Sequence, residues 1–129
     1  MKYIMITGAS SGIGEETARL LARQEDVTTI LVARNEEKLK KLVNEFGGET
    51  KYLVYDLTDV WHIESCFIKC REWGIKLDGL IHCAGIGENM PIRLIQTEHI
   101  KKMYQIHPMA FIELGKYFSC LLYTSDAAD

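Results

Sequence analysis

A glycine-rich loop near the start of the chain carries the pattern with the clearest chemical meaning. Residues 7–14 read Thr-Gly-Ala-Ser-Ser-Gly-Ile-Gly. Gly8 permits a tight turn, Gly12 lets a ligand approach the backbone, and Gly14 lets the following helix pack closely. Backbone N–H groups at the start of that helix would bind the phosphates of a dinucleotide, and serine hydroxyls would add donors. The residues expected to hold these phosphates are Gly8, Ser10, Ser11, Gly12, Ile13 and Gly14.

Such a loop binds a dinucleotide only between a strand and a helix, and the flanking sequence predicts both. Continuous apolar and β-branched runs predict buried strands at residues 3–6, 28–33, 51–55 and 80–83. Apolar residues at helical spacing predict helices at residues 12–24, 35–46, 59–73 and 97–118, the second capped by Asn35 and the third by Thr58 or Asp59. This alternation predicts an α/β fold with a doubly wound, Rossmann-like parallel sheet. The expected strand order is 3-2-1-4, truncated after the fourth strand and the helix that follows it.

The composition is that of an ordinary folded domain. The 129 residues are 47% hydrophobic and 26% charged, which excludes a disordered chain, and a net charge of −3 argues against nucleic-acid binding. No apolar run approaches the ~20 residues that cross a membrane, and the first strand ends too early for a signal peptide. We therefore expect a cytoplasmic protein that does not bind membranes. The four cysteines lack paired CxxC spacing and are predicted to be free thiols, with no metal site.

Three further segments fall where a bound dinucleotide would pass. Tyr-Asp-Leu-Thr at residues 55–58 follows the third predicted strand, His-Cys-Ala-Gly at 82–85 follows the fourth, and residues 103–107 read Met-Tyr-Gln-Ile-His. Together with the loop, which fits the pattern TGxxxGxG, these segments resemble the short-chain dehydrogenase/reductase family. The resemblance implies that the adenine ring lies beside Asp56 and Leu57, and that the cofactor ribose lies beside Cys83, Ala84 and Gly85. It also implies that His107 stands where the family carries a catalytic asparagine.

The chain departs from the family pattern at three positions. His82 and Cys83 stand where the family usually carries asparagines, although a histidine can still donate and accept hydrogen bonds between strands. His107 is followed by Pro108, which lacks an N–H group and predicts a kink in the last helix. The imidazole of His107 either relays protons or packs without taking part in chemistry, and both interpretations stay open.

The second predicted strand ends in the residues that bear on the choice of nucleotide. Arg34 lies twenty residues beyond Gly14, where NAD-selective sites usually carry an acid, and no Asp or Glu occupies residues 32–35. A guanidinium offers paired donors to a ribose 2′-phosphate. We therefore expect Arg34, with Asn35 beside it, to favour NADP over NAD, although NAD remains possible. The alternative is that Arg34 is a solvated loop charge.

The resemblance implies an NADP(H)-dependent oxidoreductase that interconverts a carbonyl and an alcohol on a small-molecule substrate. The family's proton donor lies in a YxxxK motif, and no tyrosine of this chain has a lysine four residues later. We therefore expect the catalytic serine and YxxxK in a longer parent protein, a homodimer or homotetramer, and expect this chain alone to be unstable and inactive. The alternative is a non-catalytic dinucleotide-binding or sensing protein.

The last ten residues, 120–129, resemble the translation of a common sequencing-library adapter. We therefore expect residues 120–129 to be non-native. Residues 1–119 would then be the NAD(P)-binding Rossmann domain at the amino-terminal end of a longer protein. The alternative is a natural helix end at residues 120–123 followed by a polar tail.

Overall fold

A parallel sheet forms the centre of the molecule. The computed structural model describes residues 1–86 and 90–127, with side chains up to residue 120. The described strands are β1 (Lys2–Thr7), β2 (Val27–Ala33), β3 (Lys51–Val54) and β4 (Gly79–His82), and every pairing between neighbours is parallel. Their order is β3-β2-β1-β4, so the predicted order 3-2-1-4 is confirmed. The helices are α1 (Gly12–Ala22), α2 (Glu36–Phe46), α3 (Glu64–Glu72), α4 (Thr97–Tyr104) and α5 (Ala110–Ala127), with a 3-10 turn at Ile92–Leu94 and a π-helical turn at Gln105–Met109.

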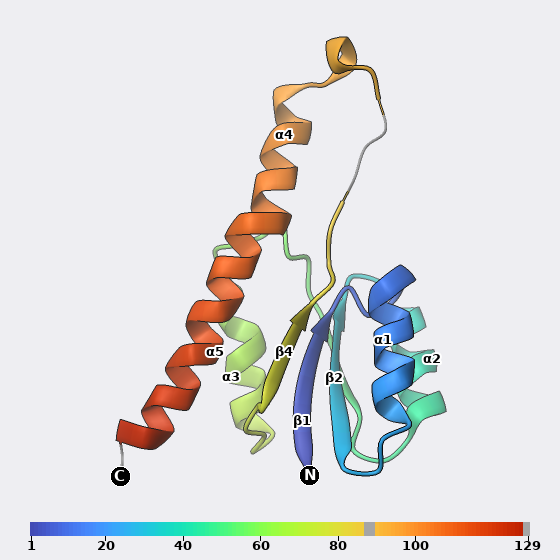
Figure 1. Cartoon of the computed structure of the whole chain (residues 1–129), viewed down its shortest axis with the longest axis vertical. Coiled ribbons are helices and arrows are strands. Elements are labelled where there is room, and N and C mark those ends of the chain that lie inside the picture. Colours follow the sequence, from blue (N-terminus) through green and yellow to red (C-terminus); the bar gives the residue numbers. More distant parts are fainter. Residues whose placement is uncertain (87–89, 128–129) are drawn as a thin grey trace.

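Helices cover both faces of the sheet, with α1 and α2 on one side and α3 and α5 on the other (Figure 1). The alternation of side chains along a strand produces the two cores. On β2, Leu31 and Ala33 join the apolar cluster under α1 and α2, whereas Ile30 and Val32 join the larger cluster under α3 and α5. All four residues are buried, which accounts for the continuous apolar run that predicted this strand.

The second helix begins as its sequence predicts. The side chain of Asn35 accepts a hydrogen bond from the backbone N–H of Lys38 at 3.1 Å, so the predicted cap is confirmed. Glu15 of α1 then joins the two helices on this face, because its carboxylate lies 2.7 Å from the ammonium of Lys38. Arg19 pairs with Glu15 and also with Glu45 of α2. The pair with Lys38 joins the start of α2 to the first turn of α1, and the pair between Arg19 and Glu45 joins the last turns of the two helices.

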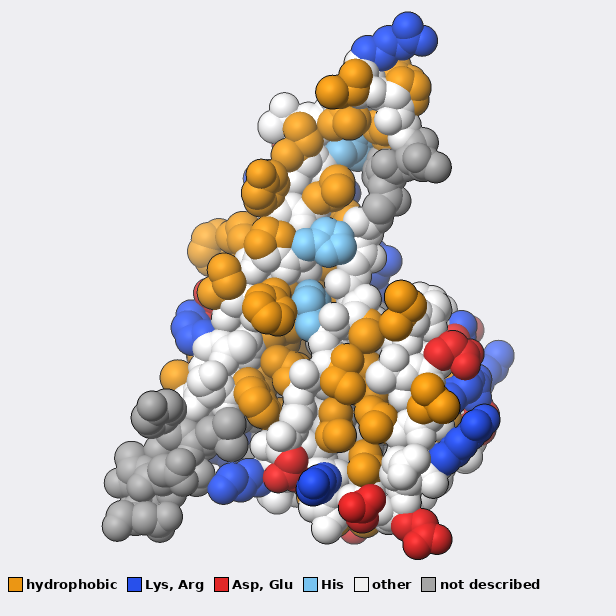
Figure 2. Space-filling view, viewed as in Figure 1, with side chains coloured by type: hydrophobic (Ala, Val, Ile, Leu, Met, Phe, Trp, Pro, Cys, Tyr) orange, Lys and Arg blue, Asp and Glu red, His pale blue; other side chains and the backbone are white. Residues whose placement is uncertain are grey.

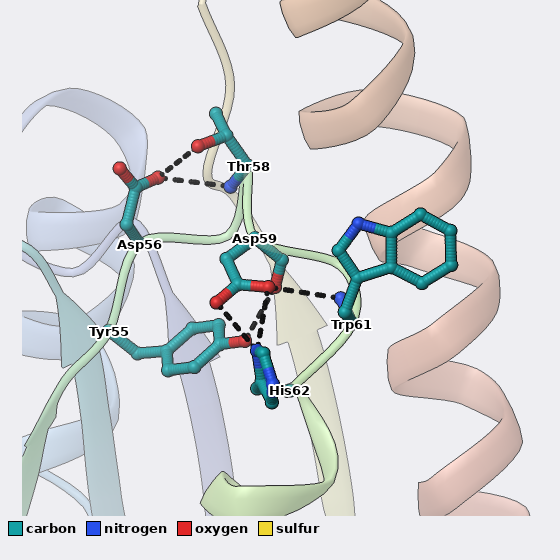
Figure 3. A network of polar contacts seen from close by, with 6 residues as sticks. All are labelled: Tyr55, Asp56, Thr58, Asp59, Trp61 and His62. Carbon is teal, nitrogen blue, oxygen red and sulfur yellow. Dashed lines mark hydrogen bonds and ion pairs between the residues drawn. The ribbon is translucent and has the colours of Figure 1, made fainter.

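The third helix begins later than predicted, at Glu64 rather than after Thr58 or Asp59. Two aspartate carboxylates accept hydrogen bonds from the backbone N–H groups two residues ahead, and these local turns take the place of the predicted helix start (Figure 3). Asp56 accepts hydrogen bonds from the N–H and the hydroxyl of Thr58, and Asp59 accepts one from the N–H of Trp61. Residues 56–63 therefore form turns at the end of β3.

The sequence predicts a kink in the last helix at Pro108. The structure has a wider, π-helical turn at this place. Residues Gln105–Met109 adopt one π-helical turn, and α5 continues from Ala110 to Ala127, beyond the predicted end at residue 118. The missing N–H of Pro108 explains the local widening, since the ordinary hydrogen bond to Tyr104 cannot form. Helix α5 thus includes residues 120–127 of the predicted tail, whose origin stays a prediction.

Helix α4 rises beyond the carboxyl edge of the sheet, where hydrophobic side chains gather along α4 and α5 (Figures 1 and 2). The exposed apolar residues of this part include Ile100, Met103, Tyr104, Phe111 and Ile112. Strand β4 is an edge of the described sheet, as predicted. Within the described ranges, no helix has both the length and the apolar character of a membrane span.

Candidate functional site

A pocket lies at the carboxyl ends of the strands, the edge where open parallel sheets bind ligands. The glycine loop contributes Gly8, Ser10 and Ser11 to its wall. The other lining residues come from the ends of β2 and β3, the segment after β4 and the π-helical turn: Val32, Ala33, Arg34, Tyr55, Asp56, Leu57, Cys83, Ala84, Gly85 and Ile106. The structure therefore brings together, in one pocket, residues that were predicted separately from four parts of the sequence.

Four predicted cofactor residues do not line this pocket. Gly12 and Gly14 belong to the start of α1, Asn35 caps α2, and Ile13 is 80% exposed over a neighbouring hollow. Conversely, sequence reasoning missed a further set of lining residues. Val32 and Ala33 lie at the end of β2, and Tyr55 follows β3, so their place at the carboxyl ends of predicted strands could have identified them. The fourth residue, Ile106, is a buried residue of the π-helical turn.

The glycine loop is packed tightly against the segment after β4. Gly8 has a φ of +66°, and a Cβ there would lie 2.6 Å from the backbone nitrogen of Ala84. A Cβ on Gly14 would lie 2.0 Å from the carbonyl oxygen of Gly8. Both contacts involve backbone atoms, which cannot rotate away. The roles predicted for these two glycines, a tight turn and close helix packing, are thus visible in the geometry.

The first turn of α1 is arranged to receive an anion. Ser11 is the N-cap residue with extended backbone angles, φ −158° and ψ 161°, yet its side chain makes no capping hydrogen bond. The first N–H groups of a helix have no partners inside the helix. Those of α1, together with the Ser11 hydroxyl, therefore fit the diphosphate of a dinucleotide.

Asp56 marks the far wall of the pocket. Partial burial on its own would raise the pKa of this carboxyl, but the hydrogen bonds from Thr58 and the charges of Arg34 and Lys102 lower the pKa below its ordinary value. Asp56 is therefore an ionised hydrogen-bond acceptor at neutral pH. The following turn is held by the Tyr55 hydroxyl, which donates to the carbonyl oxygen of Asp59 at 2.5 Å (Figure 3).

Arg34 lies at the end of β2 on the pocket wall, and its side chain is exposed. The nearest acids in sequence, Glu36 and Glu37, belong to the first turn of α2, as expected. Glu36 accepts a hydrogen bond from Tyr52 and pairs with Lys40. The residues that line the pocket at the end of β2 therefore include the positive charge of Arg34 and no acidic side chain.

His82 connects the glycine loop to the π-helical turn. Its Nδ1 lies 2.7 Å from the hydroxyl of Thr7, and its Nε2 lies 3.1 Å from the carbonyl oxygen of Ile106. The same Thr7 hydroxyl accepts the N–H groups of Cys83 and Ala84 at 3.0 and 3.2 Å. His82 therefore does serve as a structural link between strands, as the sequence indicated.

His107 lines the neighbouring hollow, together with Ile13, His82, Cys83, Ala84, Gly85, Pro108 and Phe111. Its Nε2 lies 2.8 Å from the carbonyl oxygen of Ile86 and 3.2 Å from the N–H of the same residue. One nitrogen cannot donate and accept at once, and the shorter contact favours donation to the carbonyl. The ring also covers Gly85, where a Cβ would lie 2.5 Å from Cε1 of His107.

Comparison with known proteins agrees with this geometry. The sequence model of a family described as short chain dehydrogenase matches residues 2–127. The chain belongs to this short-chain dehydrogenase family. The chain is 36% identical over 110 residues to an uncharacterized oxidoreductase of Listeria innocua, covering 82% of this chain and 44% of that protein.

Solved short-chain dehydrogenase structures superpose on this chain as well. The structure of L-sorbose reductase from Gluconobacter frateurii, complexed with NADPH and L-sorbose, has a TM-score of 0.84 and 26% identity, over 96% of this chain and 48% of that one. An alcohol dehydrogenase from the archaeon Thermococcus sibiricus, complexed with 5-hydroxy-NADP, has a TM-score of 0.82 and 30% identity, over 95% and 53% of the two chains. The chain thus spans about half the length of the relatives that it matches.

Proposed function

We propose that this chain forms the NADP(H)-binding part of an oxidoreductase that interconverts a carbonyl and an alcohol on a small molecule. The observation that carries the proposal is the single pocket that joins the glycine loop, Arg34, Asp56 and the segment after β4. The family supports oxidoreductase chemistry, and two of the similar structures hold NADPH or an NADP derivative. The nucleotide preference rests on Arg34.

Each wall of the pocket has a proposed task. The loop and the first turn of α1, including Gly12, Ile13 and Gly14, would bind the diphosphate through backbone N–H groups. The carboxylate of Asp56 and the backbone of Leu57 would orient the adenine ring, and residues 83–85 would contact the ribose. Arg34 would donate to the 2′-phosphate, with Asn35 fixing the start of α2 beside it. When bound, NADPH supplies a hydride to the carbonyl carbon.

We propose that His107 takes part in proton transfer. The alternative is that its ring only packs on Gly85 and Ile86 in the segment after β4. Because its Nε2 donates to the carbonyl of Ile86, Nδ1 is the ring nitrogen left to accept a proton. A proton donor for the substrate oxygen would come from residues that this chain does not carry, since it contains no YxxxK motif. The chain alone is accordingly proposed to bind nucleotide without turning over substrate.

The exposed apolar side chains of α4 and α5 extend the proposal to assembly. Ile100, Met103, Tyr104 and Phe111 expose at least a third of their surface, which supports self-association into a dimer or tetramer of the whole protein. Cys66, Cys70 and Cys83 form no disulfide, which supports a reducing, cytoplasmic location.

Titration of the whole protein with NADPH and NADH tests the nucleotide proposal, because the chain alone is expected to be unstable. NADPH is expected to bind more tightly, and Arg34→Asp is expected to weaken NADPH binding by roughly tenfold to a hundredfold, because a charged hydrogen bond to phosphate is lost. NADH binding should change by less than about threefold, since its ribose carries no phosphate. Lys76→Asp makes the same charge change in the exposed loop before β4 and should leave both affinities unchanged. An equal loss of both nucleotides in Arg34→Asp would contradict the assignment.

A further inference from the structure

His82 is bonded to two walls of the nucleotide pocket, although its own ring lines the neighbouring hollow. Its Nδ1 lies 2.7 Å from the hydroxyl of Thr7, and its Nε2 lies 3.1 Å from the carbonyl oxygen of Ile106. Ile106 belongs to the wall of the nucleotide pocket. The imidazole therefore acts on that pocket through its two hydrogen-bond partners.

The Thr7 hydroxyl connects the ring to the wall that the proposed function assigns to the cofactor ribose. Its oxygen accepts the N–H groups of Cys83 and Ala84 at 3.0 and 3.2 Å, and both residues line the pocket. The backbone of Ala84 lies against the glycine loop, since a Cβ on Gly8 would be 2.6 Å from the nitrogen of Ala84. Segments packed this closely transmit displacements to one another. A shift of Ala84 would therefore move the loop that is proposed to bind the diphosphate.

This arrangement fits a neutral imidazole and conflicts with a protonated one. A hydroxyl group has one hydrogen to donate and two lone pairs that accept. Because two N–H groups engage the lone pairs of the Thr7 hydroxyl, its hydrogen is donated to Nδ1 of His82, which must carry no proton. A proton on Nδ1 would point at an oxygen with no lone pair left. Thr7 must then release either the imidazole or one of the two N–H groups.

The surroundings of His82 contain little that would stabilise an imidazolium ion. The titratable side chains that line the hollow with it are Cys83, from the end of the same strand, and His107, from the π-helical turn. Among the described residues that line this hollow, none carries a carboxylate. On α5, Glu113 and Lys116 pair with each other at 2.8 Å. The larger side chains that α1, the π-helical turn and α5 contribute to the hollow are apolar: Ile13, Pro108 and Phe111.

We propose that His82 is a positioning residue of the nucleotide site, whose neutral imidazole holds residues 83–85 in place through the Thr7 hydroxyl and whose protonation weakens nucleotide binding. The inference rests on the proposed function and adds regulation by pH to the same site. An asparagine, the usual residue of the family at this place, would hold the segment without this sensitivity, because an amide does not titrate in this range.

The affinity for nucleotide should fall as the pH drops below about 6.5, the ordinary pKa of a histidine. Burial lowers the pKa of His82, the hydrogen bond to Ile106 works against this shift, and the charge of His107 adds to it. The free protein therefore takes up this proton only below the ordinary value. Since the nucleotide-binding wall needs the neutral ring, protonation and nucleotide binding oppose each other by the same factor.

Calorimetric titration of the whole protein with NADP⁺ from about pH 8 to about pH 5 tests this inference across the range in which histidine titrates. We expect the wild-type affinity to fall by roughly threefold to tenfold, which corresponds to the loss of one hydrogen bond. Circular dichroism at each pH restricts the comparison to folded protein. The 2′-phosphate of NADP⁺ takes up a proton near pH 6 as well, so the contribution of His82 is the difference between wild type and variants.

His82→Asn should bind NADP⁺ within about threefold of wild type at neutral pH and should lose the part of the acid-dependent fall that His82 causes. His62→Asn makes the same substitution at an exposed histidine that pairs with Asp59, and the fall should persist there. A second pair of variants acts at the partner of the ring. Thr7→Val removes the hydroxyl, so it should weaken binding at every pH and abolish the contribution of His82, whereas Thr7→Ser should retain both.

Three results would overturn the inference. The first is a folded His82→Asn variant whose affinity follows wild type at every pH, which would confine the role of the ring to folding. The second is a Thr7→Val variant that keeps the full acid-dependent fall, and this pair decides the question if His82→Asn does not fold. The third is loss of the fall in His107→Asn but not in His82→Asn. Failure of the wild-type protein to bind NADP⁺ at neutral pH would instead overturn the proposed function itself.

Discussion

The hydroxyl oxygen of Thr7 lies 2.7 Å from Nδ1 of His82, and this contact fixes which nitrogen of the imidazole carries the proton. Thr7 Oγ1 already accepts the N–H groups of Cys83 and Ala84, so its own hydrogen is donated to Nδ1. The proton of the neutral ring must then be on Nε2, which donates to the carbonyl of Ile106. One side chain thereby joins β1, β4 and the π-helical turn, and it does so only while the ring is neutral.

The folded protein should lose stability in mild acid because of His82. Burial lowers the pKa of His82, with help from the nearby His107 and against the hydrogen bond to Ile106. The unfolded histidine takes up a proton near pH 6.5, whereas the folded one does so only at lower pH. Between these values the unfolded state binds more protons, so the free energy of unfolding falls as the pH drops below about 6.5. Urea unfolding at several pH values measures this slope.

His82→Asn supplies the comparison, since an amide keeps a donor and an acceptor but does not titrate in this range. The variant should be less stable at neutral pH and should lose the part of the acid sensitivity that His82 causes. His62→Asn alters an exposed histidine that pairs with Asp59, and the sensitivity due to His82 should persist there. An unchanged acid slope in His82→Asn would show that the buried imidazole is not its source.

Gly14→Ala should be strongly destabilising although alanine favours helices. The added Cβ would lie 2.0 Å from the carbonyl oxygen of Gly8, so the glycine loop must move. Overpacking of this kind costs about 1–3 kcal/mol or more of unfolding free energy. Gly115→Ala is the control, because that helical glycine has open space around its Cβ position and should gain up to about 1 kcal/mol. Thermal or urea unfolding distinguishes the two, and equal effects would argue against the tight loop packing.

The sequence predicted most of what depends on local patterns. The strands follow from apolar runs, their order follows from the doubly wound, Rossmann-like fold, and the Asn35 cap follows from one side chain that reaches three residues ahead. The start of α3 was wrong, because helical spacing does not reveal that Asp56 and Asp59 bind the neighbouring backbone first. Contacts between distant residues were beyond reach as well. The packing of His107 on Gly85 depends on how the helix after β4 returns over the sheet.

Gly85→Ala should disturb His107 more than any other group. A Cβ at residue 85 would lie 2.5 Å from Cε1 of the ring, whose Nε2 is held by the carbonyl of Ile86. We expect a loss of about 1–3 kcal/mol of unfolding free energy. Gly79→Ala is the matched control in β4, since its Cβ would meet Ile4 at an ordinary 3.4 Å.

A double-mutant cycle tests whether the imidazole causes this loss. His107→Ala removes the obstructing ring, so the cost of adding Gly85→Ala should fall by at least about 1 kcal/mol in that background. Additive losses would place the obstruction elsewhere. The same cycle followed by NADPH titration reports whether the position of His107 affects the nucleotide pocket.

The cysteines should differ sharply in reactivity toward iodoacetamide. Burial raises the pKa of Cys66 to about 12 and that of Cys70 to about 11, so neither thiol supplies much thiolate near pH 8. Cys83 is half-buried and lines the nucleotide pocket. Peptide mapping by mass spectrometry should therefore find Cys83 alkylated well before Cys66 and Cys70, and all three alkylated at similar rates in urea. If the proposed nucleotide site is correct, saturating NADPH should slow the alkylation of Cys83 alone. Protection of Cys66 and Cys70 to the same degree would instead indicate a general gain in stability on binding.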